Sequence, residues 1–170
     1  MGDNLNIGGE FRIHVDGLRE VEEELGRLSA KSGDLTPLMK VIGDVLVAGT
    51  RDRFERGEGP DGTPWKPSLR AELEGGQTLL DSRQLHDSVH FEARSDQVEV
   101  GSNLIYAGVH QLGATIVPVN AGALHFKLPG GLGLRTVQQV VIPARPYLGV
   151  SDYDEDEIRG AVAIYAGAEA

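Results

Sequence analysis

The sequence predicts an α+β fold, with N-terminal helices and a C-terminal helix packed on an antiparallel β-sheet that carries a long β-hairpin. Two observations predict it. Apolar residues recur at helical spacing in the first third of the chain and at its end, and strand-like alternation fills the middle. Helices and strands are therefore grouped, whereas a parallel α/β sheet requires them to alternate. The length of 170 residues fits a single domain over residues 1–170.

Four segments have the apolar spacing of helices. They are residues 18–28, 36–54, 82–89 and 152–168. The second is apolar on more than one side, which predicts a central, buried helix. The last begins with acidic residues, which suit the positive end of a helix dipole. Between the second and third, residues 57–76 are rich in glycine and proline and are predicted to be a loop.

Alternating apolar and polar residues predict the strands. The alternation of Phe11, Ile13 and Val15 predicts that residues 1–15 form a short strand or an ordered N-terminal arm. Later in the chain, two alternating runs flank a polar turn, which is the pattern of a β-hairpin at residues 89–100.

A second group of strands is expected after this hairpin. Its three candidates are residues 114–119, 124–128 and 137–142. The glycine-rich residues 129–133 separate the last two and have the composition of a hairpin tip. Residues 115–140 are therefore predicted to form a hairpin extension.

Composition excludes several classes of protein. The formal net charge of −10 argues against a protein that grips phosphate backbones, although it permits one that surrounds DNA without holding it. The absence of cysteine excludes disulfides, thiolate nucleophiles and cysteine-ligated zinc. Neither a secretory signal nor an apolar run long enough for a membrane span is visible. We expect a soluble protein that is used in the cytoplasm or built into a particle there.

Catalytic motifs are absent from the sequence. His86 and His90 stand four residues apart, but the helix that would align them is expected to end near Val89, and no His-Glu-x-x-His motif accompanies them. No serine lies in a nucleophile elbow. We expect a protein without enzymatic activity, cofactor or bound metal; a metal-dependent hydrolase that uses these histidines and the acidic run after Ser151 is the distant alternative.

Four patches, in order along the chain, carry a family resemblance. They are Arg53-Phe54 with residues 59–67, residues 80–89, residues 98–113, and the Ile-Pro-Ala-Arg-Pro-Tyr-Leu-Gly stretch at residues 142–149. In this order and at these spacings the chain resembles the phage virion morphogenesis proteins, a group that includes tail-completion proteins of tailed phages and prophages. The resemblance covers about residues 18–160.

Two departures from the family pattern stand out. Arg83 occupies a position where the family commonly has glycine, which predicts a relaxed turn there. Residues 115–139 are longer and less family-like, so the hairpin extension is expected to be specific to this phage's partners.

The resemblance implies a structural protein of the virion, assembled in the cytoplasm of the host bacterium. Such a protein acts at the head-proximal end of the tail, completes the tail and lets it join the head. Related subunits form homo-oligomeric rings, commonly six-fold, so a hexamer is expected. The implied partners are tail terminator or tube proteins and head connector proteins, with DNA passing through the ring without specific binding. A tail terminator or a minor capsid or neck component is the alternative.

Candidate contact residues lie in the patches. They are Trp65, His110, Gln111, Arg145 and Tyr147. The two prolines flanking Ala144-Arg145 hold an extended segment that cannot be an interior strand, which leaves a sheet edge or a subunit contact that displays Arg145 to a carboxylate. Tyr147 is expected to anchor the stretch in the core. For Trp65, an anchor in the core or a loop is favoured over a contact with a neighbour.

An acidic run begins the last helix. Its members are Asp152, Asp154, Glu155, Asp156 and Glu157. A solvated helix start explains the run, and so does an acidic surface that, repeated around a ring, lets DNA slide past without sticking. The sequence leaves both interpretations open.

Overall fold

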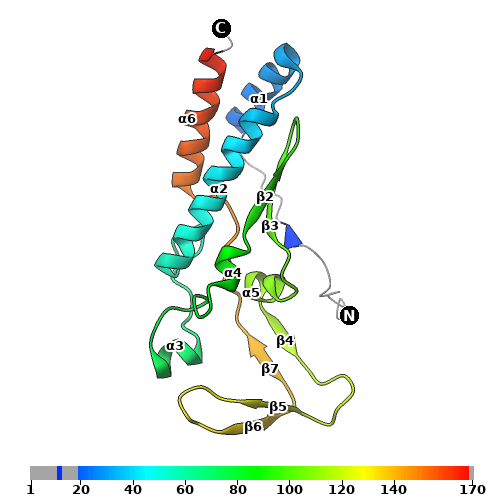
Figure 1. Ribbon diagram of the computed structural model, residues 1–170, viewed down its shortest axis with the longest axis vertical. Helices are drawn as coiled ribbons and strands as arrows, with labels where there is room; N and C mark the ends of the chain where they lie inside the picture. Colours follow the sequence, from blue (N-terminus) through cyan, green and yellow to red (C-terminus); the bar gives the residue numbers. More distant parts are fainter. Residues whose placement is uncertain (1–10, 13–18, 169–170) are drawn as a thin grey trace.

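The computed structural model describes residues 11–12 and 19–168. It confirms an α+β fold with antiparallel strands (Figure 1). The helices are α1 (Arg19–Ser32), α2 (Thr36–Arg56), α3 (Leu69–Glu74), α4 (Gln84–Asp87), α5 (Ala107–Leu112) and α6 (Asp152–Ala168). The strands are β1 (Phe11–Arg12), β2 (His90–Ala93), β3 (Val98–Ser102), β4 (Ala114–Ile116), β5 (Leu124–Lys127), β6 (Leu134–Val137) and β7 (Val140–Ile142).

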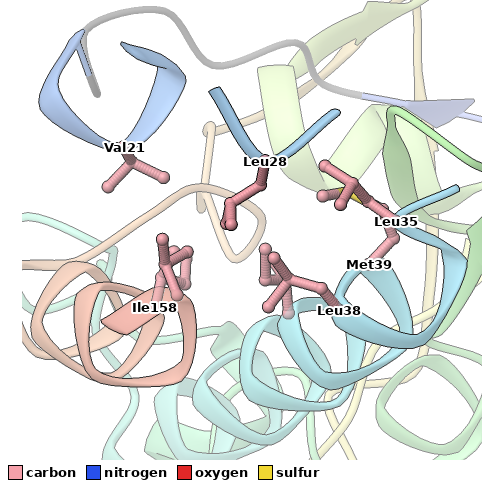
Figure 2. Close-up of a cluster of buried hydrophobic side chains, with 8 residues drawn as sticks. Val21, Leu28, Leu35, Leu38, Met39 and Ile158 are labelled. Atoms are coloured by element: carbon pink, nitrogen blue, oxygen red, sulfur yellow. The ribbon is translucent and has the colours of Figure 1, made fainter. Parts of the chain in front are cut away.

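The three long helices form one end of an elongated molecule (Figure 1). Figure 2 shows that their apolar faces meet in a core, to which α1 gives Val21 and Leu28, and α6 gives Ile158. Because α2 packs against α6 and also against β2 and β3, it is the central helix that its apolar composition predicts. It ends where Gly57 adopts a left-handed conformation (φ 72°) and its N–H donates to the carbonyl of Arg53 at 2.8 Å.

A three-stranded antiparallel sheet in the order β1-β3-β2 lies against α2. The predicted hairpin is confirmed as β2 and β3, with a turn in which Arg94 N–H donates to Gln97 O at 2.8 Å. Phe11 and Arg12 pair with β3, so the first residue of the Phe11-Ile13-Val15 alternation lies in a strand. Residues 1–10 of the predicted strand or arm lie outside the described residues. Ile13 and Val15 lie outside the described residues.

Two two-stranded ladders form the end of the molecule opposite the helices (Figure 1). β4 pairs with β7, and beyond them β5 pairs with β6. The two ladders are nested around one tip, and residues 117–123 and 138–139 separate them. The candidate strand at residues 137–142 is divided between β6 and β7. The glycine-rich tip is confirmed: Leu128 N–H donates to Gly133 O at 2.8 Å across it.

Two local predictions were wrong, and one helix was not predicted. The region predicted as loop contains α3, whose first turn is capped by the Ser68 hydroxyl accepting from Ala71 N–H. Helix α5 was not predicted from the sequence. Arg83 does not relax the turn before α4, because its backbone keeps the left-handed conformation (φ 60°) that glycine adopts more readily.

Candidate functional site

Residues 142–149, the fourth family patch, run from the end of β7 to the start of α6 and are held by side chains from distant parts of the chain. The segment leaves the ladder at Pro143, as its two prolines predict. Its first link to the body is a backbone hydrogen bond from Arg145 N–H to His110 O at 2.7 Å. The close approach of α5 depends on Gly113, since a Cβ there would lie 2.7 Å from the nitrogen of Ala144.

Gln111 in α5 binds the segment as a neighbouring strand would. Its side-chain oxygen accepts from the N–H groups of Tyr147 and Leu148 at 2.9 and 3.0 Å, and its Nε2 donates to Leu148 O at 3.0 Å. The side chain is buried. One amide therefore satisfies three buried backbone groups that have no strand partner.

Arg53 in α2 is the centre of a buried polar network. Its guanidinium donates to the carbonyls of Tyr147 (2.9 Å) and Gly149 (3.0 Å), and to the carboxylate of Asp154 at 2.6 Å. The remaining contact is Thr50 Oγ1 at 2.9 Å. The Arg53 and Asp154 side chains are only 3% and 1% exposed.

Asp154 joins α6 to this network. Besides Arg53, its Oδ2 accepts from the N–H and the hydroxyl of Ser151, at 2.9 and 2.8 Å. Ser151 Oγ in turn accepts from Asp154 N–H at 3.2 Å, so the two residues cap the start of α6 reciprocally. Its Oδ1 lies against α2 where Gly49 leaves space, since a Cβ on Gly49 would stand 1.9 Å from that oxygen. The Arg53–Asp154 pair therefore connects α2, the segment and α6.

Three aromatic side chains pack together next to this network. Phe54 lies between Trp65 and Tyr147, with ring centroids 5.6 and 5.0 Å away. Trp65 Nε1 donates to Pro146 O at 2.9 Å, and the Tyr147 hydroxyl donates to Ala107 O at 3.2 Å. Burial, with a smaller contribution from Tyr106, raises the pKa of Tyr147 well above its usual range. Trp65 and Tyr147 are thus core anchors within the subunit.

Arg145 turns inward, and the prediction that it is displayed to a carboxylate is wrong. Its side chain is buried and donates to the carbonyls of Lys66 (2.8 Å) and Pro67 (3.4 Å). Burial lowers its pKa from the ordinary arginine value. The guanidinium thereby fastens the loop after Trp65 to the segment.

His110 is the half-buried member of the predicted contact set. Burial, and secondly the charge of Arg145, lower its pKa from the ordinary value of 6.5. Its Nδ1 is buried and has no hydrogen-bond partner among the described residues, and its ring meets Tyr106 edge-on at 5.9 Å. A neutral imidazole suits this position.

The acidic run divides into buried and exposed members. Asp154 is buried, so its assignment to the acidic surface is wrong: the Arg53 guanidinium and the Ser151 cap draw it inward. Glu155 is half-buried and paired with Arg159. The exposed members are Asp152, Asp156 and Glu157.

Clusters of metal-binding side chains are absent from the part of the chain that the structure describes. Over residues 11–12 and 19–168, no group of three or more histidine, aspartate or glutamate side chains could hold a metal ion. His86 Nδ1 lies 2.6 Å from Asp87 Oδ1, and His90 Nδ1 lies 2.9 Å from Ser88 O, so each imidazole is bonded locally. Within the same residues, no helix has the length and apolar character needed to cross a membrane.

Comparisons with known proteins agree with the resemblance. The phage virion morphogenesis family matches residues 16–165. The chain is similar to the Mu-like prophage FluMu G protein 2 of Haemophilus influenzae, 28% identical over 148 residues that cover 87% of this chain and 90% of that protein. It is also similar to the putative capsid assembly protein G of Escherichia phage Mu, 27% identical over 164 residues that cover 90% of this chain and 92% of the relative. No solved structure matches it. The protein therefore belongs to the phage virion morphogenesis family.

Proposed function

We propose that this phage structural assembly protein acts, without enzymatic activity, at the head-proximal end of the tail, where it completes the tail and enables head and tail to join. In this role it forms a homo-oligomeric ring, with six copies as the expected number, which contacts tail terminator or tube proteins on one side and head connector proteins on the other. Its place in the mature particle is the neck.

The proposal rests on one observation: side chains of the first and third family patches bind the fourth patch within the same subunit. Arg53 and Trp65 from the first patch and Gln111 from the third all bind backbone groups of the fourth. Polar side chains in an active site are directed at a substrate, whereas these are directed at the chain itself. Such internal cross-linking suits a rigid part of a particle.

The exposed acidic residues support a passage for DNA. Asp152, Asp156 and Glu157 lie on the first turns of α6 and are open to solvent. Repeated around a ring and facing its lumen, they would repel phosphate groups, so that DNA could pass without binding.

Electron microscopy of phage particles made without this protein tests the proposal. Filled heads and free tails should accumulate, and supplying the protein in trans should restore joined virions. Normally joined particles in its absence would refute the proposed role.

A role on the head side is the second candidate, because one relative is named a putative capsid assembly protein. In that case the chain is a minor capsid or neck component, or else a tail terminator that caps a different surface. Pull-downs with purified tail tubes and with purified head connectors separate these roles: a tail-completion protein binds the tube, and a head-side component binds only the connector.

A further inference from the structure

One long stretch of this chain contains no acidic residue. All 26 acidic residues lie outside residues 100–151, a stretch that contains three basic residues, Lys127, Arg135 and Arg145. Arg145 is buried, so the exposed positive charge of this stretch lies on Lys127 in β5 and Arg135 in β6. The β5–β6 ribbon therefore carries one exposed basic residue on each of its faces, on a protein of net negative charge.

One face of this ribbon is open to solvent. The register pairs Lys127 with Leu134 and His125 with Thr136, so these four side chains point to the same side. His125 Nδ1 and Thr136 Oγ1 lie 2.9 Å apart, in agreement with that register. All four residues are exposed, and Leu134 is 81% exposed. A large apolar side chain thus lies beside a lysine on an uncovered surface.

The ribbon also lacks support from other strands. Among the described residues β5 and β6 pair only with each other, which leaves an open edge on each strand. A two-stranded ribbon is marginally stable in water unless its face packs on something. Contact with another molecule would supply that packing.

A surface of complementary character lies between α2 and α6. It is a groove of about 440 Å³ with an apolar lining that includes Val41, Val45 and Ile164. Val41 is 47% exposed and Ile164 77% exposed. Asp156 and Glu157 also line it, and none of the ion pairs between described residues uses either carboxylate. The groove offers apolar contact beside negative charge, where the ribbon offers apolar contact beside positive charge.

The two surfaces cannot meet within one subunit. The β5–β6 ribbon lies at one end of the molecule, and α6 and the first half of α2 lie at the other (Figure 1). A contact between them must join two copies head to tail. Head-to-tail contacts generate rings when the rotation between copies closes.

We propose that the β5–β6 ribbon of each copy seats in the α2–α6 groove of the next copy. Leu134 enters the groove against Val41 and Ile164, and Lys127 lies beside Asp156 and Glu157. In this arrangement Asp156 and Glu157 belong to the contact between copies, so Asp152 is the exposed member of the acidic run that is left to face the lumen. This inference rests on the proposed homo-oligomeric ring and names the surfaces that form it.

Cysteine cross-linking tests the contact directly, because the natural chain contains no cysteine. A chain with Leu134→Cys and Ile164→Cys should give, on mild oxidation, a ladder of disulfide-linked multimers on a non-reducing gel. Each single variant should give no ladder. The matched control is Ile105→Cys with Ile164→Cys, because Ile105 is 68% exposed but lies outside the ribbon, and this pair should stay unlinked.

Charge reversal gives a second, independent measurement. Lys127→Glu should weaken self-association by roughly tenfold or more, measured as assembly mass by light scattering, because it brings like charges together. Adding Asp156→Lys and Glu157→Lys should recover much of the loss. All three positions are exposed, so the fluorescence of buried Trp65 should be unchanged and serves to verify folding.

The outcomes separate this inference from the proposed function. If the oligomer forms but the chain with Leu134→Cys and Ile164→Cys gives no disulfide ladder, and if Lys127→Glu does not change the assembly mass, then the proposed contact is wrong. The ring itself is not contradicted by that result. A chain that is monomeric at every concentration, or a Leu134→Cys chain that cross-links only to another particle protein, overturns the second copy as the occupant. In each case, unjoined heads and tails in particles lacking the protein would still support the proposed role in joining; the monomeric outcome would remove the ring from that proposal, and the other outcomes would not.

Discussion

Removing the carboxylate of Asp154 should be among the most destabilising single changes in the described part of this protein. Asp154→Ala leaves the Arg53 guanidinium buried beside a vacated carboxylate site, and it also removes the acceptor of the Ser151 N–H and hydroxyl. Breaking a buried ion pair by deleting one partner costs about 3–5 kcal/mol. Since whole domains are stable by roughly 5–15 kcal/mol, the variant should lose a large share of its stability. For a chain of this size the midpoint of thermal unfolding should fall by roughly 6–20 °C.

The appropriate assay is urea unfolding followed by the fluorescence of Trp65, the single tryptophan, which packs against Phe54 next to Arg53. Glu155→Ala is the matched control. It removes a carboxylate one residue away whose partner Arg159 is partly exposed, so it should cost less than about 1 kcal/mol.

A double variant tests whether the unpaired charge is the cause. Arg53→Met with Asp154→Leu removes both charges, so it should cost less than the sum of the two single changes, although carbonyls of the segment lose their donor. If Asp154→Ala costs no more than Glu155→Ala, or if the two single changes simply add, the network does not have the stabilising role assigned to it.

Three other changes have defined outcomes. Gln111→Ala should cost about 3 kcal/mol or more, because three buried backbone groups lose their partner at about 1–3 kcal/mol each; a loss no larger than that of the exposed Gln97→Ala would contradict this. Because burial lowers the pKa of His110 below 6.5, the unfolded chain binds that proton first as the pH falls: stability should be full above about pH 6.5 and decline below it, and urea midpoints for His110→Gln should show a weaker decline. Finally, Arg83→Gly should be more stable than Arg83→Ala by about 1 kcal/mol, since both lose the side chain but glycine tolerates φ 60°; equal unfolding midpoints would refute the strain.

Elements with a strong local pattern were predictable from the sequence. The helices α1, α2 and α6 and the β2–β3 hairpin are long enough for their apolar spacing to be read, and the structure has them within a few residues of the predicted positions. The six-residue helices α3 and α5 were missed. A helix of fewer than two turns carries too few apolar positions to display a period, and in α5 the glycine Gly108 weakens the helical signal further.

The sequence predicted where in the chain the candidate site lies, but not which way its side chains point. The prolines of residues 142–149 correctly predicted that this segment lies outside any interior strand. They could not predict that Arg145 turns toward the carbonyl of Lys66, 79 residues away. A pattern of neighbouring residues contains no information about a hydrogen-bond partner so far away in the sequence.

The sequence by itself determined the class of fold, the family and the part of the chain where its polar contacts concentrate. Only the tertiary structure decided which polar residues are internal. Five acidic residues begin α6, and Asp154 alone of them is buried, because it meets Arg53 from 101 residues earlier and the space beside Gly49. The physical reason is the distance along the sequence over which each effect acts. Periodicity and turn chemistry depend on a few neighbouring residues, whereas burial and ion pairing depend on which distant segments pack together.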